Sequence, residues 1–243
     1  MCCFSGKVEK VADTKIFARA TSAGRQFLVY EMAFEAAADL AMILPLPVPP
    51  RSGEDAVRFI ALDHYATFFL DLQSGFPVSR SQAFALRPAA LGAPAPQTLK
   101  VVEVGEFEAS FVPSRDDFDR LDARFRLPTE VWDDLPAYRD FGFAVFKLER
   151  GNRRVHPIAF ELPRRDPSKL FFPTVHVHDG EVHRNAHFDH TLYVQGDAPR
   201  GWAESYDVAK AFMRGDDGGL VDRAQRVFKH ELRGKHANED QYV

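Results

Sequence analysis

Cysteine is almost absent from this chain: Cys2 and Cys3 are the only two among 243 residues, and they are neighbours in the sequence. Adjacent cysteines cannot join distant parts of a fold in ordinary disulfide geometry, which excludes a disulfide-stapled architecture. Free thiols are typical of a reducing compartment. The first residues also lack the charged start and apolar stretch of a secretory signal, so the sequence predicts a cytoplasmic protein.

Long apolar runs are missing as well. The longest, residues 40–50, is too short to span a bilayer and contains four prolines, so no membrane segment is expected. A net charge of -4 provides no overall positive field for nucleic acid. The chain also lacks a phosphate-binding loop with its lysine, a dinucleotide glycine fingerprint and a Gly-x-Ser-x-Gly turn. Enzymes built on these three motifs are therefore not expected.

What the chain does have is an ordinary globular composition, with 45% hydrophobic and 27% charged residues, which is enough for one folded domain over residues 1–243. Most apolar segments read as strands, and few have helical spacing, so we predict an α+β fold, mainly antiparallel sheet with a few helices. Residues 197–243 are expected to form a helical C-terminal appendage. Strands are predicted at 15–21, 25–34, 40–46, 57–60, 98–104 and 106–112 and as a pair at 141–148 and 155–162, and helices at 65–72, 114–124, 129–138, 203–213 and 220–232.

Histidine is concentrated in one short stretch. Five of the nine histidines fall between residues 176 and 190, around the dipeptide Asp179-Gly180. That dipeptide favours a two-residue hairpin turn, which predicts a histidine-rich hairpin. In such a hairpin His176, His178 and His183 share one face, because side chains two apart on a strand point the same way.

Three imidazoles that converge from rigid strands can hold a transition metal and leave coordination positions open. We therefore predict a metal site on this hairpin, with His176 and His178 as ligands and His183 as the third. If the second strand slips by one residue at a bulge, His190 replaces His183, and His187 is a further alternative. Cys2, as a mature N-terminus, could add its thiolate to the imidazoles, and such a mixed nitrogen and sulfur set suits zinc or copper, whereas histidine with carboxylate suits zinc, iron or manganese. Metal-bound water could support hydrolysis, and the metal itself could support redox chemistry. The competing interpretation is a solvated hairpin without a metal.

Carboxylates beside the histidines could orient the imidazole rings or supply an oxygen ligand. Asp179, Glu181 and Asp189 lie in the same stretch. Glu181 is the predicted catalytic residue of a metal-dependent reaction. Asp189 and His190 are neighbours on one strand and point to opposite faces, so a direct relay between them is not expected.

Cys2 is the second candidate catalytic residue. Removal of the initiator methionine would leave its thiol beside a free α-amine, which can act as the base for the thiol. The Met-Cys start followed by Phe17-Ala18-Arg19 resembles the opening of choloylglycine-type N-terminal nucleophile hydrolases. The resemblance covers about twenty residues and implies an amidohydrolase in which Cys2 attacks and Arg19 orients the substrate. The aspartate that this family carries after the arginine is replaced here by Ala20.

A second resemblance covers residues 26–50. The Cys-Cys start, the segment Leu-Val-Tyr-Glu-Met-Ala-Phe and the apolar strand that ends in Leu-Pro-Leu-Pro are similar to an uncharacterised bacterial domain family of unknown function. This resemblance implies a shared fold core and no particular activity.

Three functions remain open from the sequence. The first is a metal-binding protein, with a metal-dependent hydrolase or oxidoreductase as its enzymatic forms. The second is an amidohydrolase with Cys2 as nucleophile. The third is a nonenzymatic binding or scaffold domain. An enzyme of either kind would take a small-molecule substrate, while nucleic acid and membranes are not expected partners, and the sequence leaves the oligomeric state open.

Overall fold

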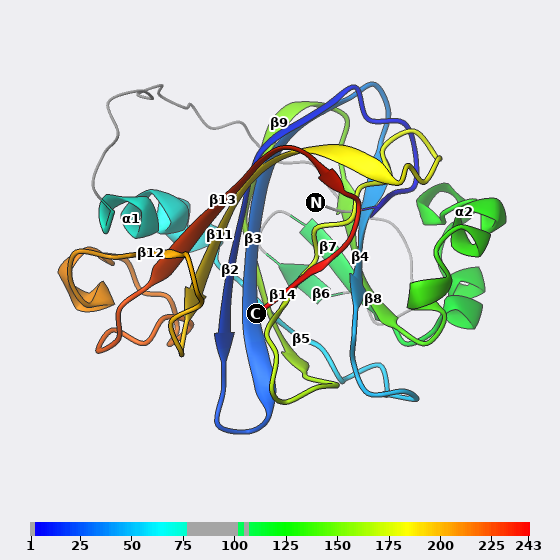
Figure 1. The fold of residues 1–243 in the computed structure, drawn as a ribbon. Helices are drawn as coiled ribbons and strands as arrows, with labels where there is room; N and C mark the ends of the chain where they lie inside the picture. The colour runs from blue at the N-terminus through cyan, green and yellow to red at the C-terminus, as the bar shows by residue number, and fades with distance from the viewer. Residues whose placement is uncertain (1–2, 77–101, 105–106) are drawn as a thin grey trace.

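The fold is built from two β-sheets that face each other, as the computed structural model in Figure 1 shows; it describes residues 3–76, 102–104 and 107–243. The larger sheet has seven strands in the order β12-β13-β11-β2-β3-β9-β5. Neighbouring strands in it are antiparallel, with the exception of the parallel pair β11 and β2. Its strands are β2 (Lys10–Ala20), β3 (Arg25–Ala36), β5 (Arg58–Ile60), β9 (Gly151–Pro163), β11 (Asn185–Gln195), β12 (Ala203–Glu204) and β13 (Phe228–Ala237).

The smaller sheet has five antiparallel strands in the order β1-β4-β8-β7-β6. A third, two-stranded sheet joins β10 (Phe171–Phe172) to β14 (Gln241–Tyr242) and places the end of the sequence beside the segment that follows β9. The strands of the five-stranded sheet are β1 (Cys3–Phe4), β4 (Leu40–Leu46), β6 (Val102–Val104), β7 (Phe107–Val112) and β8 (Gly142–Leu148).

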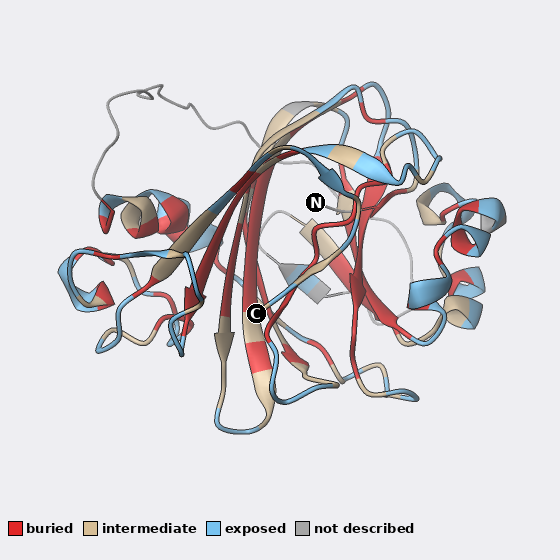
Figure 2. Ribbon diagram, in the orientation of Figure 1, coloured by how far each residue is buried: buried red, intermediate tan, exposed pale blue. Residues whose placement is uncertain are grey.

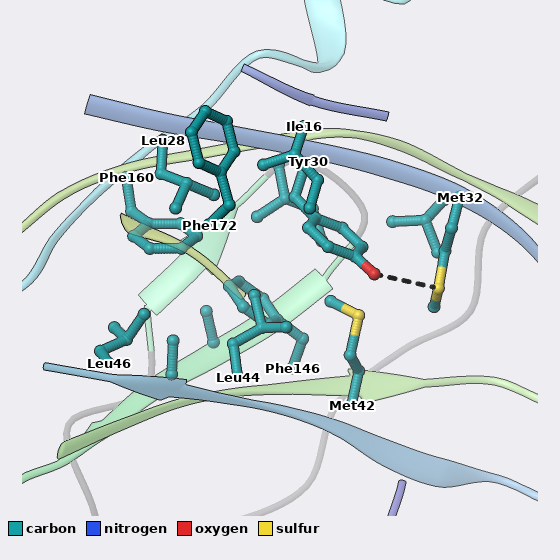
Figure 3. Close-up of a cluster of buried hydrophobic side chains, with 14 of the residues drawn as sticks. Ile16, Leu28, Tyr30, Met32, Met42, Leu44, Leu46, Phe146, Phe160 and Phe172 are labelled. Carbon is teal, nitrogen blue, oxygen red and sulfur yellow. Dashed lines mark hydrogen bonds between the residues drawn. The ribbon is translucent and has the colours of Figure 1, made fainter. Parts of the chain in front are cut away.

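The main core lies between the two large sheets. Figure 2 shows the buried residues running along the facing strands, and Figure 3 shows side chains from both sheets interdigitating. The hydroxyl of Tyr30 points at the sulfur of Met32 at 4.0 Å, so the polar end of this buried ring faces a soft acceptor. The close-up labels Ile16, Leu28, Tyr30, Met32, Met42, Leu44, Leu46, Phe146, Phe160 and Phe172.

Both large sheets are also covered on their outer faces. A second cluster packs on the five-stranded sheet, where Phe118 and Trp132 contact Phe143. A third packs on the seven-stranded sheet, where Phe68 contacts Phe17. Strands covered on both faces explain why residues 16–18 and 40–46 are continuously apolar instead of alternating. The helices that cover the five-stranded sheet are η2 (Arg115–Arg120), η3 (Ala123–Phe125), α2 (Thr129–Asp133) and η4 (Pro136–Tyr138). Those that cover the seven-stranded sheet are η1 (Asp63–Tyr65), α1 (Phe68–Ser74) and η5 (Ala209–Ala211).

The prediction of mainly antiparallel sheet with few helices is confirmed, and several strands lie where the sequence placed them. The predicted strands 15–21 and 25–34 form the antiparallel pair β2 and β3, and the predicted strand 40–46 is β4. The short strand predicted at 57–60 is β5, and the helix predicted at 65–72 corresponds to η1 and α1. Residues 77–101, most of which the sequence predicts as a long irregular connection, lie outside the described residues.

One predicted pairing is wrong. The segments 141–148 and 155–162 are strands, but β8 pairs with β4 and β7 while β9 pairs with β3 and β5. Glu149 and Arg150 carry the chain from one sheet to the other, so these strands face each other across the core and do not form a hairpin. Turn-forming residues show where the chain changes direction, but they do not determine which strand each of the two flanking strands pairs with.

The predicted helical C-terminal appendage is also wrong. Residues 228–237 form β13, which pairs with β11 over ten residues, so this part of the chain completes the seven-stranded sheet. In the region 203–213 the structure has β12 and the short 3-10 helix η5. Hydrophobic spacing near 220–232 suits a helix, but Leu220, Val221 and Val227 are buried against the outer face of the sheet without helical structure.

The predicted histidine hairpin does not form around Asp179-Gly180. Gly180 does adopt a positive φ of 85°, as a tight turn requires, but the residues before it do not pair with those after it. Val177 instead forms an isolated bridge with Cys3, and β11 begins only at Asn185. Among the described residues no helix is both long and apolar enough to cross a membrane.

Candidate functional site

His176 and His178 lie on the chain between β10 and β11, residues 173–184, which we call the histidine segment. It runs beside the N-terminal strand: the Phe4 amide donates to the Val177 carbonyl at 3.1 Å, and the Val8 amide donates to the His178 carbonyl at 3.1 Å. The Phe4 ring meets the His178 ring edge-on at 5.5 Å. These contacts use the backbone groups that a local hairpin would need, which explains why the segment stays extended.

The C-terminal tail holds the histidine segment from its other side. The Asn238 side chain accepts from the His176 amide at 2.7 Å and donates to the His176 carbonyl at 2.9 Å. The Asp240 carboxylate accepts from the amides of Thr174 and Val175 at 2.7 and 3.0 Å. It also accepts from the hydroxyl of Tyr138 at 2.7 Å, so three donors satisfy this buried group.

Burial raises the pKa of Asp240, while its three donors lower it. The same burial, together with Asp240, raises the pKa of Tyr138, so the phenol remains a hydrogen-bond donor. Nothing in the polar sequence of the C-terminal tail distinguishes Asn238 or Asp240 from surface residues. Their role depends on β13 turning back toward the histidine segment.

Three imidazoles gather where the histidine segment meets β11. The ring centroids of His176 and His178 lie 5.1 Å apart, and those of His176 and His190 lie 5.3 Å apart. His190 is fully buried, His176 is 7% exposed and His178 is partly exposed. Phe188 packs against His176 at 4.3 Å and gives the group an apolar side. The structure thus brings His190, and not His183, next to His176.

This burial keeps the imidazoles neutral. It lowers the pKa of His176 to about 2 and that of His178 to about 4, and it lowers the pKa of His190 in the same direction. The neighbouring imidazole of His178 adds to the effect on His176, because two adjacent imidazolium ions repel each other. The Nε2 atoms of His176 and His178 are buried and have no hydrogen-bond partner among the described residues. Neutral rings with buried, unpaired nitrogens can bind a metal or donate to a ligand.

A different set of ligating side chains converges on the surface. Among the described residues, one group of three His, Cys, Asp or Glu side chains has all its ligating atoms within 4.8 Å of one another: Asp179, Glu181 and His183. All three are exposed, and the Asp179 carboxylate accepts from Nε2 of the His183 ring at 3.1 Å. Asp179 raises the pKa of His183 by this hydrogen bond. Glu181, the predicted catalytic carboxylate, therefore lies apart from the buried imidazoles.

The remaining predicted residues have other positions. Cys2 lies outside the described residues, while its neighbour Cys3 is buried beside Val177. The Arg19 guanidinium donates to the carbonyls of Gly219 and Leu220, so it fastens the C-terminal loop to β2. Asp189 accepts from the Asp13 amide at 2.9 Å and forms an ion pair with Arg233, and His187 is exposed.

Comparison with known proteins gives a likeness of fold. No family model and no curated protein sequence matches the chain. Among solved structures, a mutated baculovirus P35 after caspase cleavage matches with a TM-score of 0.51 and 13% identity, over 95% of this chain and 99% of that chain. Baculovirus P35 itself matches with a TM-score of 0.49 and 13% identity, over 99% and 98%, and P35 in a caspase-8/P35 complex with 0.46 and 12%, over 95% of each. The first of these matches shows a fold similar to that of the mutated baculovirus P35 over 95% of this chain.

Proposed function

We propose that this protein is a binding protein, not an enzyme, and that its partner is a cysteine endopeptidase of the caspase type. The observation that carries the proposal is the fold: the two sheets match a baculovirus P35 that was solved after caspase cleavage, with nearly complete coverage of both chains. Because one fold can serve several functions, cleavage and complex formation are the direct tests of this proposal.

The architecture is compatible with a scaffold that survives cleavage. α1 packs on the outer face of the seven-stranded sheet, and β6 is an edge strand of the five-stranded sheet. Phe76, which follows α1, is buried, and its ring centroid lies 5.9 Å from that of Tyr193. A cut between α1 and β6 would leave each new end attached to a packed layer, so the two fragments would stay together.

The residues between α1 and β6 indicate which side chains a peptidase that cuts there would have to select. Residues 77–101 contain three cations, Arg80, Arg87 and Lys100, and no aspartate or glutamate. An endopeptidase that selects cations needs an acidic specificity pocket, as trypsin-type enzymes have. We therefore expect the partner to have an acidic specificity pocket.

The test is limited proteolysis of the native protein with a caspase and with a caspase-type endopeptidase that has an acidic specificity pocket. We expect one cut by the second enzyme, outside the strands and helices, with both fragments remaining in one particle by size-exclusion chromatography and native mass spectrometry. Heat-unfolded protein, cut at many positions, is the matched control. Cleavage of the native protein at many positions, or resistance to both enzymes, contradicts the proposal.

The second candidate is the transition-metal site, moved from the predicted hairpin to the buried imidazoles. Two imidazoles bound to one tetrahedral ion, with about 2.05 Å from metal to nitrogen, have ring centroids roughly 5.2 Å apart. The separations of 5.1 and 5.3 Å around His176 fit that spacing, and the unpaired Nε2 atoms of His176 and His178 supply donors. Among the described residues, the ring nitrogens of these three histidines do not all lie within 4.8 Å of one another. The imidazole rings would therefore have to rotate about their side-chain bonds to bring one nitrogen each onto the ion.

Elemental analysis of tag-free protein tests this second candidate. One zinc or copper ion per chain is expected, and none in His176→Ala, whereas the exposed His187→Ala variant keeps its metal. Metal that persists in His176→Ala but disappears in His183→Ala would place the ion at the surface group instead. Cys2→Ala protein, analysed in parallel, shows whether the thiol contributes.

A further inference from the structure

A hollow on the opposite end of the sandwich from the histidines has the chemistry of a small ligand site. It has a volume of about 240 Å³ and lies where β9, the β10–β14 pair and the end of β4 meet. His190 pairs with Thr14 on β2, whereas Gln26, which lines the hollow, pairs with Ala20. Six residues of strand separate those two positions, which is roughly 20 Å along the sheet.

Aromatic rings form one wall of this hollow. Phe141, Phe171 and Tyr242 contact in series, with ring centroids 6.5 and 5.2 Å apart. Phe141 and Phe171 are almost fully buried, while Tyr242 is 47% exposed and lies at the entrance. A wall of this kind favours a flat apolar group, because aromatic faces and edges pack well against another ring.

Positive charge dominates the rest of the lining. Arg164, Arg165 and Lys169 line the hollow together with one carboxylate, Asp166. Asp166 lies 3.3 Å from Lys169 and accepts from both the amide and the hydroxyl of Ser168, so it is already engaged. The lining therefore has a net positive charge that an anion would neutralise.

The two arginines have different roles. The Arg165 guanidinium donates to the Val48 carbonyl and to Asp140 and stacks on the Phe141 ring at 4.9 Å, which makes it a fixed part of the wall. Arg164 has no carboxylate partner among the residues that the structure describes. Its Nη1 donates to the Pro167 carbonyl at 2.5 Å, and its buried Nε has no acceptor in the same part of the chain. Since no carboxylate of the described residues neutralises this guanidinium, an anion bound at it would gain a charge-assisted hydrogen bond.

We propose that this hollow, formed by Phe141, Phe171, Tyr242 and Arg164, binds a small organic carboxylate with a flat apolar body. The carboxylate lies against Arg164, where a guanidinium can form two parallel hydrogen bonds, and the ring lies against the aromatic wall. The volume is below the usual range for drug-sized ligands, so the hollow suits a single ring with a short anionic arm. This inference is independent of the proposed protease partner.

The test is an NMR titration of the full chain with benzoate, with benzyl alcohol and acetate as matched probes. Benzoate is expected to bind with a Kd on the order of 1 mM, since so small a ligand makes few contacts. Benzyl alcohol keeps the ring without the charge, and acetate keeps the charge without the ring, so each should bind at least tenfold more weakly. The shifted resonances should belong to residues 162–171 and 241–243.

Two variants assign the binding to these residues. Arg164→Gln should weaken benzoate binding at least tenfold, while Arg58→Gln, which removes an exposed cation paired with Glu161 elsewhere on the sheet, should leave it unchanged. Tyr242→Ala, at the partly exposed entrance, should weaken it severalfold and serves as the second variant if Arg164→Gln does not fold. Equal affinity for benzoate and benzyl alcohol, equal loss in Arg58→Gln, or no binding at tens of millimolar would overturn the proposal.

Discussion

The buried imidazoles predict a specific loss of stability in mild acid. The unfolded chain protonates a histidine near pH 6.5, but burial lowers the folded pKa of His176 to about 2 and that of His178 to about 4. Because the folded pKa is the depressed one, the unfolded state binds more protons between pH 6.5 and these values, and stability falls as pH falls through that window. Above pH 6.5 the stability is fully present.

The size of this loss follows from the two pKa shifts. Going from pH 7 to pH 5, His176 alone costs about 2 kcal/mol, at 1.36 kcal/mol per pH unit below the unfolded pKa. His178 is partly exposed, so solvent screening reduces its share to about 1 kcal/mol. Burial also lowers the pKa of His190, which adds to this loss, so the total is at least ~3 kcal/mol, a large part of the stability of a typical domain. His183 acts in the opposite direction, since Asp179 raises its pKa, but its exposure makes that effect small.

Urea unfolding of metal-free protein in a chelating buffer, at pH 7 and pH 5, measures this difference. Wild type should lose at least ~3 kcal/mol, and His176→Gln should lose about 2 kcal/mol less than wild type, because one titrating group is gone. His187→Gln removes an exposed histidine of β11 and should behave like wild type. An identical loss in wild type and His176→Gln, or no loss in either, would refute the account of the buried imidazoles.

Three further substitutions test the contacts that hold the fold. Asp240→Ala removes the carboxylate that accepts from the histidine segment, so the free energy of unfolding should fall by about 3 kcal/mol and hydrogen exchange should rise at residues 174–178. Glu239→Ala should leave both quantities unchanged. Gly142→Ala places a methyl group 2.5 Å from the buried ring of Phe111, so a cost of about 1–3 kcal/mol is expected by urea unfolding; Gly53→Ala, in open space, should cost much less. Asp217→Ala removes the partner of Arg223 and the acceptor of two loop amides, which should lower the melting temperature, whereas Asp216→Ala should lower it less; equal effects of the two would contradict the assigned role.

The sequence predicts best where the decisive forces are local. β2, β3 and β4 could be predicted because their apolar runs, the Ser22-Ala23-Gly24 turn and the prolines after Leu44 act within a few residues. Figure 2 shows why the runs are continuous, since both faces of these strands are covered. Partner choice could not be predicted. β8 and β9 are adjacent in sequence, yet β8 pairs with β4, about one hundred residues earlier, and β9 pairs with β3, still further back in the chain.

The same reasoning explains the outcome at the histidines. A concentration of His residues near a turn signal could be recognised, and His176 and His178 do lie together. Three distant contacts decide the rest: Cys3 beside Val177, Asn238 on His176, and Asp240 on the two residues before it. Each joins segments more than sixty residues apart, and no local pattern encodes them. The prediction that His190 could replace His183 was made for a hairpin, whereas the structure positions His190 through β11.

We propose that this sandwich binds a caspase-type endopeptidase and remains one particle after a single cut. The most direct measurement is native mass spectrometry of the folded protein mixed with an active endopeptidase of that type that has an acidic specificity pocket. The account predicts a one-to-one complex, together with a loss of peptidase activity on a reporter peptide that reaches its limit at one equivalent. Free peptidase with undiminished activity at tenfold excess of the protein would contradict it.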